Sequence, residues 1–179
     1  MPGPAVTESD RAPGPAANGM IRDAVTPGDI ASARELFAEY AASLDVDLCF
    51  QDFAGELAGL PGDYAPPSGC LLLLRLDDLD AGCVALRPIA PGTVELKRLY
   101  LRADARRGGW GRRLALAAIE RARALGYREI KLDTLATMVA AQKLYATLGF
   151  RPCAPYYRNP LPDPVYLSLV LDTAAHPAK

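Results

Sequence analysis

The spacing of apolar residues along the chain changes between a period of two residues, typical of strands, and a period of three to four residues, typical of helices. The first half of the chain predicts a strand, two helices and three further strands, in that order, at residues 20–25, 30–44, 51–58, 70–76, 83–87 and 93–101. Residues 77–82, which contain three aspartates and end in a glycine, lie between two apolar runs, so this segment is predicted to form the turn of a hairpin.

In the second half, strands alternate with helices. The predicted helix at residues 110–125 has apolar residues along one side and arginines along the other, which is the pattern of a helix packed on a core. A strand at 127–133, a helix at 138–148 and a strand at 165–171 follow. The order is β-α-(α)-β-β-β-α-β-α-β-β. It predicts a domain of the α/β class, with a central mixed β-sheet that contains an antiparallel hairpin region and is flanked by helices.

Length and composition agree with one folded domain, because the 179 residues are 50% hydrophobic and 23% charged. We predict this domain at residues 20–172, between a disordered tail rich in proline and alanine at 1–19 and a short tail at 173–179. The net charge of −1 argues against nucleic-acid and membrane partners, which favour basic proteins. No apolar run reaches the ~18 residues of a membrane helix and no signal peptide is recognisable, so a cytoplasmic protein is expected.

Two residue types restrict the chemistry. The four cysteines include no C-x-x-C pair, which argues against a zinc or redox site. The only histidine, His176, lies in the polar C-terminal tail, which excludes a Ser-His-Asp or Cys-His pair and a histidine-rich metal site. No metal is therefore expected, and acid–base chemistry has to come from carboxylates, tyrosines, lysines or water.

One segment has the composition of an anion-binding site. Residues 106–112 read Arg-Arg-Gly-Gly-Trp-Gly-Arg and lie between a predicted strand and a predicted helix. The first turn of a helix has unpaired N–H groups and a partial positive charge, glycines let the backbone approach a ligand, and arginines suit phosphate oxygens. The segment predicts phosphate or pyrophosphate binding, although such a turn is often only a loop. It lacks the Lys-Ser/Thr ending of a Walker loop and does not follow the first strand, as a dinucleotide fingerprint would.

Three segments together resemble the GNAT superfamily of N-acetyltransferases. Arg106–Gly111 matches the family signature Q/R-x-x-G-x-G/A, Glu95–Leu101 looks like the family's fourth strand, and Leu144–Phe150 is similar to its L-Y-x-x-x-G-F element. Their order and spacing fit, and the resemblance extends from Met20 to Leu171. It implies the GNAT-type acyl-CoA N-acyltransferase fold and acetyl-CoA as the co-substrate.

The resemblance also implies roles for particular residues. Glu95 would be the general base that deprotonates the acceptor amine, and Tyr145 would donate a proton to the departing thiolate. The backbone of Leu99 and Leu101 would bind the pantetheine arm, and an N–H of one of them would stabilise the charged thioester oxygen. The predicted acetyl-CoA-binding residues are Leu99, Tyr100, Leu101, Arg106, Arg107, Gly108, Gly109, Trp110, Gly111 and Arg112. Met138 stands where many members have an asparagine that contacts CoA.

Plainer explanations stand beside these roles. Glu95 could be a solvated strand residue or could pair with Lys97 or Arg98, and Tyr145 could be a packed aromatic side chain. The predicted acceptor-side residues are Phe50, Tyr64, Arg98, Tyr156 and Tyr157, and ordinary packing beneath loops would explain the aromatics as well.

The acceptor is only partly defined by the sequence. Arg98 and Arg158 could pair with a substrate carboxylate, which points to a small amine or an amino-acid-like molecule. A lysine or N-terminus of a protein is the alternative acceptor. A catalytically silent acyl-CoA-binding regulatory domain and a nucleotide binder are the alternatives to an acetyltransferase. Dimers are common in the family, so a homodimer is a further expectation.

Overall fold

The computed structural model describes residues 18–44, 52–106, 108–161 and 163–171. Within these ranges the strands are β1 (Gly19–Asp23), β2 (Cys70–Leu76), β3 (Leu79–Ala90), β4 (Thr93–Leu101), β5 (Glu129–Leu135), β6 (Arg151–Pro152) and β7 (Pro164–Val170). The helices are α1 (Pro27–Ala42), α2 (Phe53–Gly59), α3 (Trp110–Ala124) and α4 (Val139–Thr147), with short 3-10 helices η2 (Gly62–Tyr64) and η3 (Ala103–Arg106). The predicted order of elements is confirmed.

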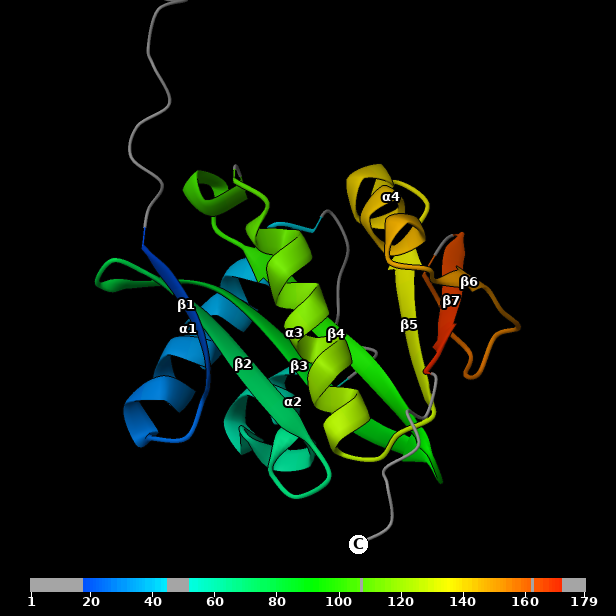
Figure 1. Ribbon diagram of the computed structural model, residues 1–179, viewed down its shortest axis with the longest axis horizontal. Helices are drawn as coiled ribbons and strands as arrows, with labels where there is room; N and C mark the ends of the chain where they lie inside the picture. The colour runs from blue at the N-terminus through cyan, green and yellow to red at the C-terminus, as the bar shows by residue number, and fades with distance from the viewer. Residues whose placement is uncertain (1–17, 45–51, 107, 162, 172–179) are drawn as a thin grey trace, which may run out of the picture.

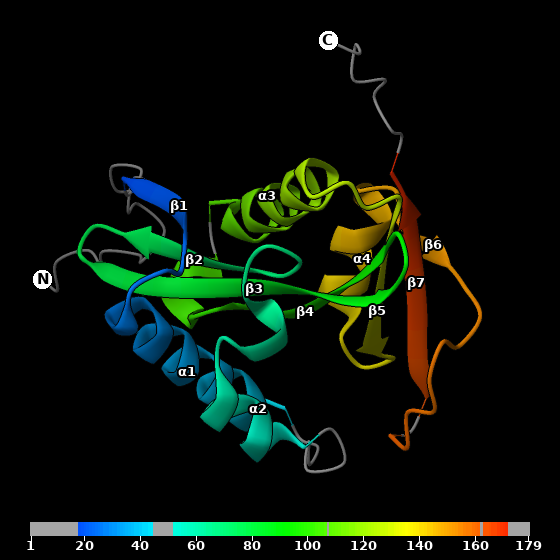
Figure 2. The ribbon, with the colours of Figure 1, turned by 90° about the horizontal axis from the view of Figure 1, so that it is seen from below.

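The described strands form one mixed sheet with helices on both faces. Neighbouring strands follow the order β1-β2-β3-β4-β5-β7-β6, and β4 and β5 run parallel while the other described pairs are antiparallel. Helices α3 and α4 lie on one face of the sheet, and α1 and α2 lie on the other (Figure 1, Figure 2). This arrangement confirms the predicted α/β fold class, a central mixed sheet flanked by helices.

Two apolar clusters hold these layers together. Under α3, the side chains of Leu114 and Ala118 pack on the sheet with Ile130 of β5, and all three are 0% exposed. On the opposite face, Leu36 and Phe37 of α1 pack on β2 and β3 and are equally buried. Because alternate residues of β2 and β3 belong to the two different clusters, the register of these two strands is fixed by burial on both faces.

The hairpin of β2 and β3 turns earlier than predicted. Leu76 pairs with Leu79, so the turn consists of Asp77 and Asp78, and the predicted turn residues 79–82 belong to β3. Asp77 has a φ of 50°, a conformation that aspartate tolerates better than most residues in a tight turn. Asp80 can lie within a strand because its carboxylate pairs with Arg22 of β1 at 3.1 Å.

The separation of β4 from β5 is the feature that positions the functional site. The two strands pair at Thr93–Glu129, Val94–Ile130 and Glu95–Lys131. Beyond Glu95, β4 continues to pair with β3 and β5 continues to pair with β7, but no described pairing joins β4 to β5. A bulge accompanies the separation: the register of β4 with β3 shifts, and Arg98 there has a φ of 58°.

Candidate active site

A cleft of about 800 Å³ opens where β4 and β5 separate. Its walls come from the end of α1, the side of β4 that faces away from β3, the loop after β5 and the first turn of α4. The predicted acetyl-CoA-binding residues that line it are Leu99, Tyr100, Leu101 and Arg106. The cleft thus follows the stretch of β4 whose backbone has lost its pairing with β5.

The bulge turns one backbone N–H of β4 toward this cleft. The carbonyl oxygen of Arg98 accepts a hydrogen bond from Sγ of Cys83 at 3.3 Å, on the β3 side of the strand. In a trans peptide the C=O and the following N–H point in opposite directions. The N–H of Leu99 therefore points away from β3, toward the cleft that Leu99 lines.

The turn before α3 has the backbone that an anion site requires. Gly108 and Gly109 have φ values of 94° and 76°, a region that residues with a side chain disfavour. A Cβ added to Gly109 would meet no atom of the described residues within 4 Å, so the backbone is open to a ligand there. Gly109 caps α3 without a side-chain hydrogen bond, and no acidic residue stands in the first turn. The first N–H groups of α3 are therefore available to an anion.

The other residues of the predicted anion-binding segment, 106–112, lie in different surroundings. Trp110 is 9% exposed and packs in the core, with the guanidinium of Arg113 4.5 Å from its ring centre. Gly111 follows it in the first turn of α3, where Arg112 is exposed. Arg107 lies outside the described residues. The structure thus offers backbone groups at the turn, while the indole of Trp110 anchors the helix to the core.

A second, smaller pocket of about 70 Å³ adjoins the cleft and shares Tyr40, Leu99 and Met138 with it. Tyr145 of α4 and Asp133 of β5 form part of its wall. Tyr145 is 6% exposed, and burial raises the pKa of its hydroxyl above the usual value. The hydroxyl therefore stays protonated at neutral pH, as a proton donor must.

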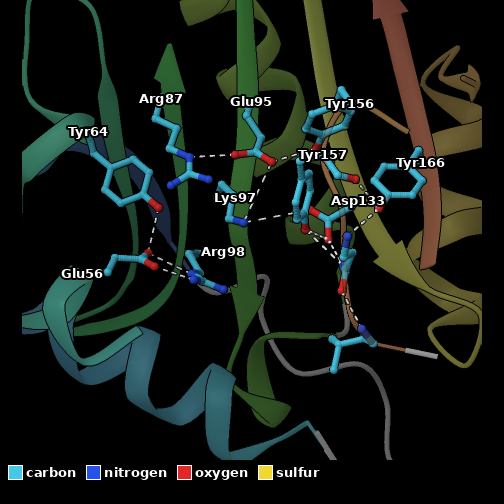
Figure 3. Close-up of polar contacts among 12 residues, drawn as sticks. Glu56, Tyr64, Arg87, Glu95, Lys97, Arg98, Asp133, Tyr156, Tyr157 and Tyr166 are labelled. Carbon is cyan, nitrogen blue, oxygen red and sulfur yellow. Dashed lines mark hydrogen bonds and ion pairs between the residues drawn. The ribbon is translucent and has the colours of Figure 1, made fainter. Parts of the chain in front are cut away.

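A chain of buried charges lies on the sheet face opposite α3, along β4 and β5 (Figure 3). Glu95 is 1% exposed, and its carboxylate accepts hydrogen bonds from Nε of Arg87 and from the hydroxyl of Tyr156, both at 2.7 Å. Nζ of Lys97 lies 3.9 Å from Glu95 and 4.0 Å from Asp133. Burial lowers the pKa of Lys97, because removal from water disfavours its charged form.

A neighbouring buried pair joins β4 to α2. Nε of Arg98 donates a hydrogen bond to Glu56 at 2.9 Å, and the hydroxyl of Tyr64 donates to the same carboxylate at 2.7 Å. Burial works to raise the pKa of Glu56, but its contacts with Arg98 hold it below the usual value. Two predicted acceptor-side residues, Arg98 and Tyr64, are thus engaged with Glu56, and their part in acceptor binding stays a prediction.

The loop between β6 and β7 closes the same face of the sheet with aromatic side chains. The hydroxyl of Tyr157 and Nδ2 of Asn159 donate hydrogen bonds to Oδ2 of Asp133, at 2.7 and 2.9 Å. The rings of Tyr156 and Tyr157 lie 5.3 Å apart. The structure therefore brings both predicted loop tyrosines to the acids of β4 and β5, while Phe50 lies outside the described residues.

Four residues of this site were missing from the predicted functional residues: Glu56, Asp133, Asn159, and Lys97, which was named only as a possible partner of Glu95 and does pair with it at 3.9 Å. The signal for two of them was available, because Glu95 and Lys97 stand two positions apart on β4, as Lys131 and Asp133 do on β5. Charges at alternate positions of adjacent strands share one face of a sheet. The partners Glu56 and Asn159 lie on segments whose approach to the strands depends on the fold.

The described part of the chain offers neither a metal-binding cluster nor a membrane-spanning helix. No cluster of three or more histidine, cysteine or acidic side chains within residues 18–44, 52–106, 108–161 and 163–171 could hold a metal ion. None of the helices in these ranges combines the length and the apolar character needed to cross a membrane.

Comparison with known proteins gives the class of this chain. The model of the acetyltransferase (GNAT) family matches residues 31–150, which is more than half of the sequence. The protein is therefore an acyltransferase, and it belongs to the GNAT family of acetyltransferases.

Individual relatives agree with this assignment. An uncharacterized N-acetyltransferase of Schizosaccharomyces pombe is 40% identical over 145 residues, which cover 80% of this chain and 89% of the relative. N-acetylaspartate synthetase of Danio rerio is 34% identical over 118 residues, covering 64% of this chain and 42% of that protein. A solved acetyltransferase from Salmonella typhimurium, with its cofactor acetyl-CoA, superposes with a TM-score of 0.65 at 22% identity, covering 90% of this chain and 99% of the other.

Proposed function

We propose that this chain transfers the acetyl group of acetyl-CoA to a primary amine of a small molecule or amino-acid-like acceptor, by direct attack of the amine. The observation that carries this proposal is the junction of two spaces, the cleft of about 800 Å³ along β4 and the pocket of about 70 Å³ at Tyr145. The larger space suits the extended donor, and the smaller one suits the reacting groups.

The residues present fit acetyl-CoA in two ways. Among the described strands, none pairs with the backbone of β4 from Leu99 to Leu101 on the cleft side, so this backbone can bind an extended pantetheine arm as an added strand. The open turn at Gly108 and Gly109 and the N-terminus of α3 suit a pyrophosphate. The acetyl-CoA complex of the Salmonella relative supports the same donor.

Two observations support a small acceptor with a carboxylate. The pocket that adjoins the cleft is small and includes Lys97 and Arg98 in its wall, and cationic side chains favour an acidic group on the ligand. The similarity to N-acetylaspartate synthetase, although it covers less than half of that protein, favours an amino-acid acceptor. Arg158, which was also predicted to pair with the substrate carboxylate, is exposed and does not line this pocket, and Phe50 lies outside the described residues.

The reaction needs a proton acceptor for the amine and a proton donor for the sulfur. At neutral pH an alkyl ammonium group has to lose a proton before its nitrogen can attack. We propose that this proton enters the carboxylate network that contains Glu95, the predicted base. The N–H of Leu99 stabilises the negative charge on the thioester oxygen. Tyr145, protonated because of its burial, gives its proton to the departing sulfur.

Release of the CoA thiol, measured with a panel of acceptors, tests this function. The panel contains acidic and neutral amino acids, simple alkyl amines, and peptides with a free N-terminus or an internal lysine. We expect the highest kcat/KM for small amines that carry a carboxylate. The same panel with N-acetylated amino acids is the control, because these compounds keep the carboxylate and lack the reactive amine.

Other outcomes point to the alternatives. A higher kcat/KM for peptides would identify a protein acetyltransferase. Acetyl-CoA binding by calorimetry without turnover of any acceptor would identify a silent acyl-CoA-binding domain. Binding of ATP in preference to CoA would identify a nucleotide binder, and would remove the assignment of the turn to CoA.

A further inference from the structure

Among the described residues, two carboxylates form ion pairs with Lys97, and they differ in their availability to a substrate. Both oxygens of Glu95 are engaged, Oε2 by Arg87 and Oε1 by Tyr156, and the side chain is 1% exposed. Glu95 contributes to a different pocket, on the side of β4 where the strands still pair, and does not line the one that contains Tyr145. An amine could reach Glu95 only after one of these strong contacts had broken.

Asp133 has the opposite arrangement. It lines the pocket of about 70 Å³ together with Tyr145 and Leu99. Its Oδ2 accepts the hydrogen bonds of Tyr157 and Asn159, which fix the plane of the carboxylate. Within the described ranges, Oδ1 accepts no hydrogen bond, and Nζ of Lys97 is 4.0 Å from it, too far for one. One oxygen thus holds the carboxylate in place, and the other remains able to accept a proton.

The charges around the pocket favour loss of that proton. Lys97 and Arg98 both lie in its wall, where Glu95 and Glu56 partly balance their charges from behind, so an ammonium group that enters meets two cationic side chains as well as the carboxylate of Asp133. Like charges and burial both disfavour the protonated form of an amine. The amine is therefore expected to give up its proton on binding, and Asp133 is the carboxylate placed to receive it.

We propose that Asp133 binds the acceptor amine and is the general base of this enzyme, while Tyr157 and Asn159 act as positioning residues for its carboxylate. This assignment rests on the acetyl-transfer function proposed above. Glu95 then acts at a distance, by holding Lys97 and Tyr156.

One N–H bond of the ammonium breaks and its proton binds Oδ1 of Asp133, which leaves a nitrogen lone pair. The lone pair forms the N–C bond to the acetyl carbon as the C–S bond breaks, and the sulfur takes the proton of Tyr145. The second proton of the nitrogen returns to Tyr145, and Asp133 releases its own proton to water. The products are the acetylated amine, the free thiol and one proton.

The variants Asp133→Asn and Glu95→Gln form a matched pair for the test. Each replaces a carboxylate with an amide of nearly the same shape, and each removes one negative charge about 4 Å from Nζ of Lys97. The amide oxygen of Asp133→Asn can still accept from Tyr157 and Asn159, so the loop is held while the proton-accepting oxygen is lost. Acetyl-CoA affinity, measured by calorimetry without an acceptor, should match the wild type in both.

The pH dependence of kcat/KM distinguishes a base from a structural residue. A general base contributes about 100-fold or more, so we expect a loss of that size for Asp133→Asn at pH 7. Without the base the enzyme depends on amine that is already neutral, so the loss should shrink by up to tenfold per pH unit as the pH approaches the pKa of the amine, about 10. For a fluorinated ethylamine, which is largely neutral at pH 7, the loss should be small. Glu95→Gln should show a loss that varies with neither pH nor amine basicity.

Three outcomes would overturn the assignment: full activity of Asp133→Asn at pH 7, a loss in that variant that stays constant with pH and amine, or the pH-dependent loss in Glu95→Gln instead. The last result would restore Glu95 as the base. Failure of the acetyl-transfer proposal itself is visible separately, because the wild type would then release no thiol with any amine of the panel.

Discussion

Gly109 allows a sharp test of the anion-binding turn, because Gly126 beyond the other end of α3 is a matched control. The φ values are 76° and 82°, and a Cβ on either residue would meet no atom within 4 Å in the described part of the chain. Alanine at either position costs about 1–2 kcal/mol of folding free energy, because L residues disfavour the left-handed region. In a domain of this size each kcal/mol lowers Tm by about 2–4 °C. Gly109→Ala and Gly126→Ala should therefore both melt about 2–8 °C below the wild type.

Ligand binding should separate the two variants. The methyl group of Gly109→Ala enters the space that we assign to the pyrophosphate, so we expect the Kd for acetyl-CoA to rise at least tenfold, or about 1.4 kcal/mol. At a concentration 100 times the wild-type Kd, acetyl-CoA stabilises the wild type by about 2.7 kcal/mol. A tenfold weaker variant gains only about 1.4 kcal/mol at that concentration. Gly126→Ala should gain as much as the wild type.

Thermal denaturation over a series of acetyl-CoA concentrations measures both quantities in one experiment, and calorimetry gives the Kd independently. Equal acetyl-CoA affinity in the two variants and the wild type would refute the assignment of the turn, whatever the catalytic rates. Weak acetyl-CoA binding in both variants would mean that backbone strain at either end of α3 disturbs the cleft. The assignment of the pyrophosphate to the open backbone at Gly109 would then be wrong as well.

Two further predictions concern the tyrosines. Tyr145→Phe should lower kcat by about 10²-fold or more, because it removes the proton donor. The acetyl-CoA Kd should stay nearly unchanged, because the packed ring is kept. Single-turnover measurements check this, and an unchanged rate would remove the donor role. Burial raises the pKa of Tyr156 and Tyr157, so the folded form of each keeps its proton above pH 10 while the unfolded form loses it. The stability present below pH 10 should therefore fall by about 1.4 kcal/mol per pH unit for each of them as the pH rises further. Urea unfolding at pH 8 and pH 10.5 measures the onset of this loss, about 0.8 kcal/mol for each tyrosine at pH 10.5. Tyr156→Phe should make the loss smaller, and an equal loss in the variant would contradict the prediction.

The parts of the fold that were predictable are those in which neighbouring residues determine the structure. The strand at residues 93–101 was predicted with its observed bounds, because a Pro-Gly turn precedes it and the apolar alternation is local. The β2–β3 turn was predicted too long, because Asp80 and Gly82 are polar or small and suggest a turn. Asp80 is tolerated in the strand through its pairing with Arg22, which is 58 residues away in the sequence.

The same distinction between local and long-range determinants applies to the functional site. The glycine-rich turn is a contiguous segment at the start of a helix, so its anion-binding character follows from local physics. The charged cluster depends instead on β4 and β5 lying parallel in one register, which places Glu95 opposite Lys131. Asp133 becomes part of the site because the β6–β7 loop folds back onto it through Tyr157. Such contacts between distant segments are absent from any local pattern.

The three residue pairs between β4 and β5 are placed to act as a hinge between the two strands. From Glu95 to Leu101 the segment of β4 beyond this hinge is about 20 Å long, at ~3.3 Å per residue. A rotation of about 5° at the hinge would move the far end of that segment by roughly 1.7 Å. Displacements of about 1 Å between reacting groups can change a rate by about 10²-fold. Val94 and Ile130, which are fully buried and form the middle one of the three pairs, therefore contribute to the width of the cleft although neither residue lines it.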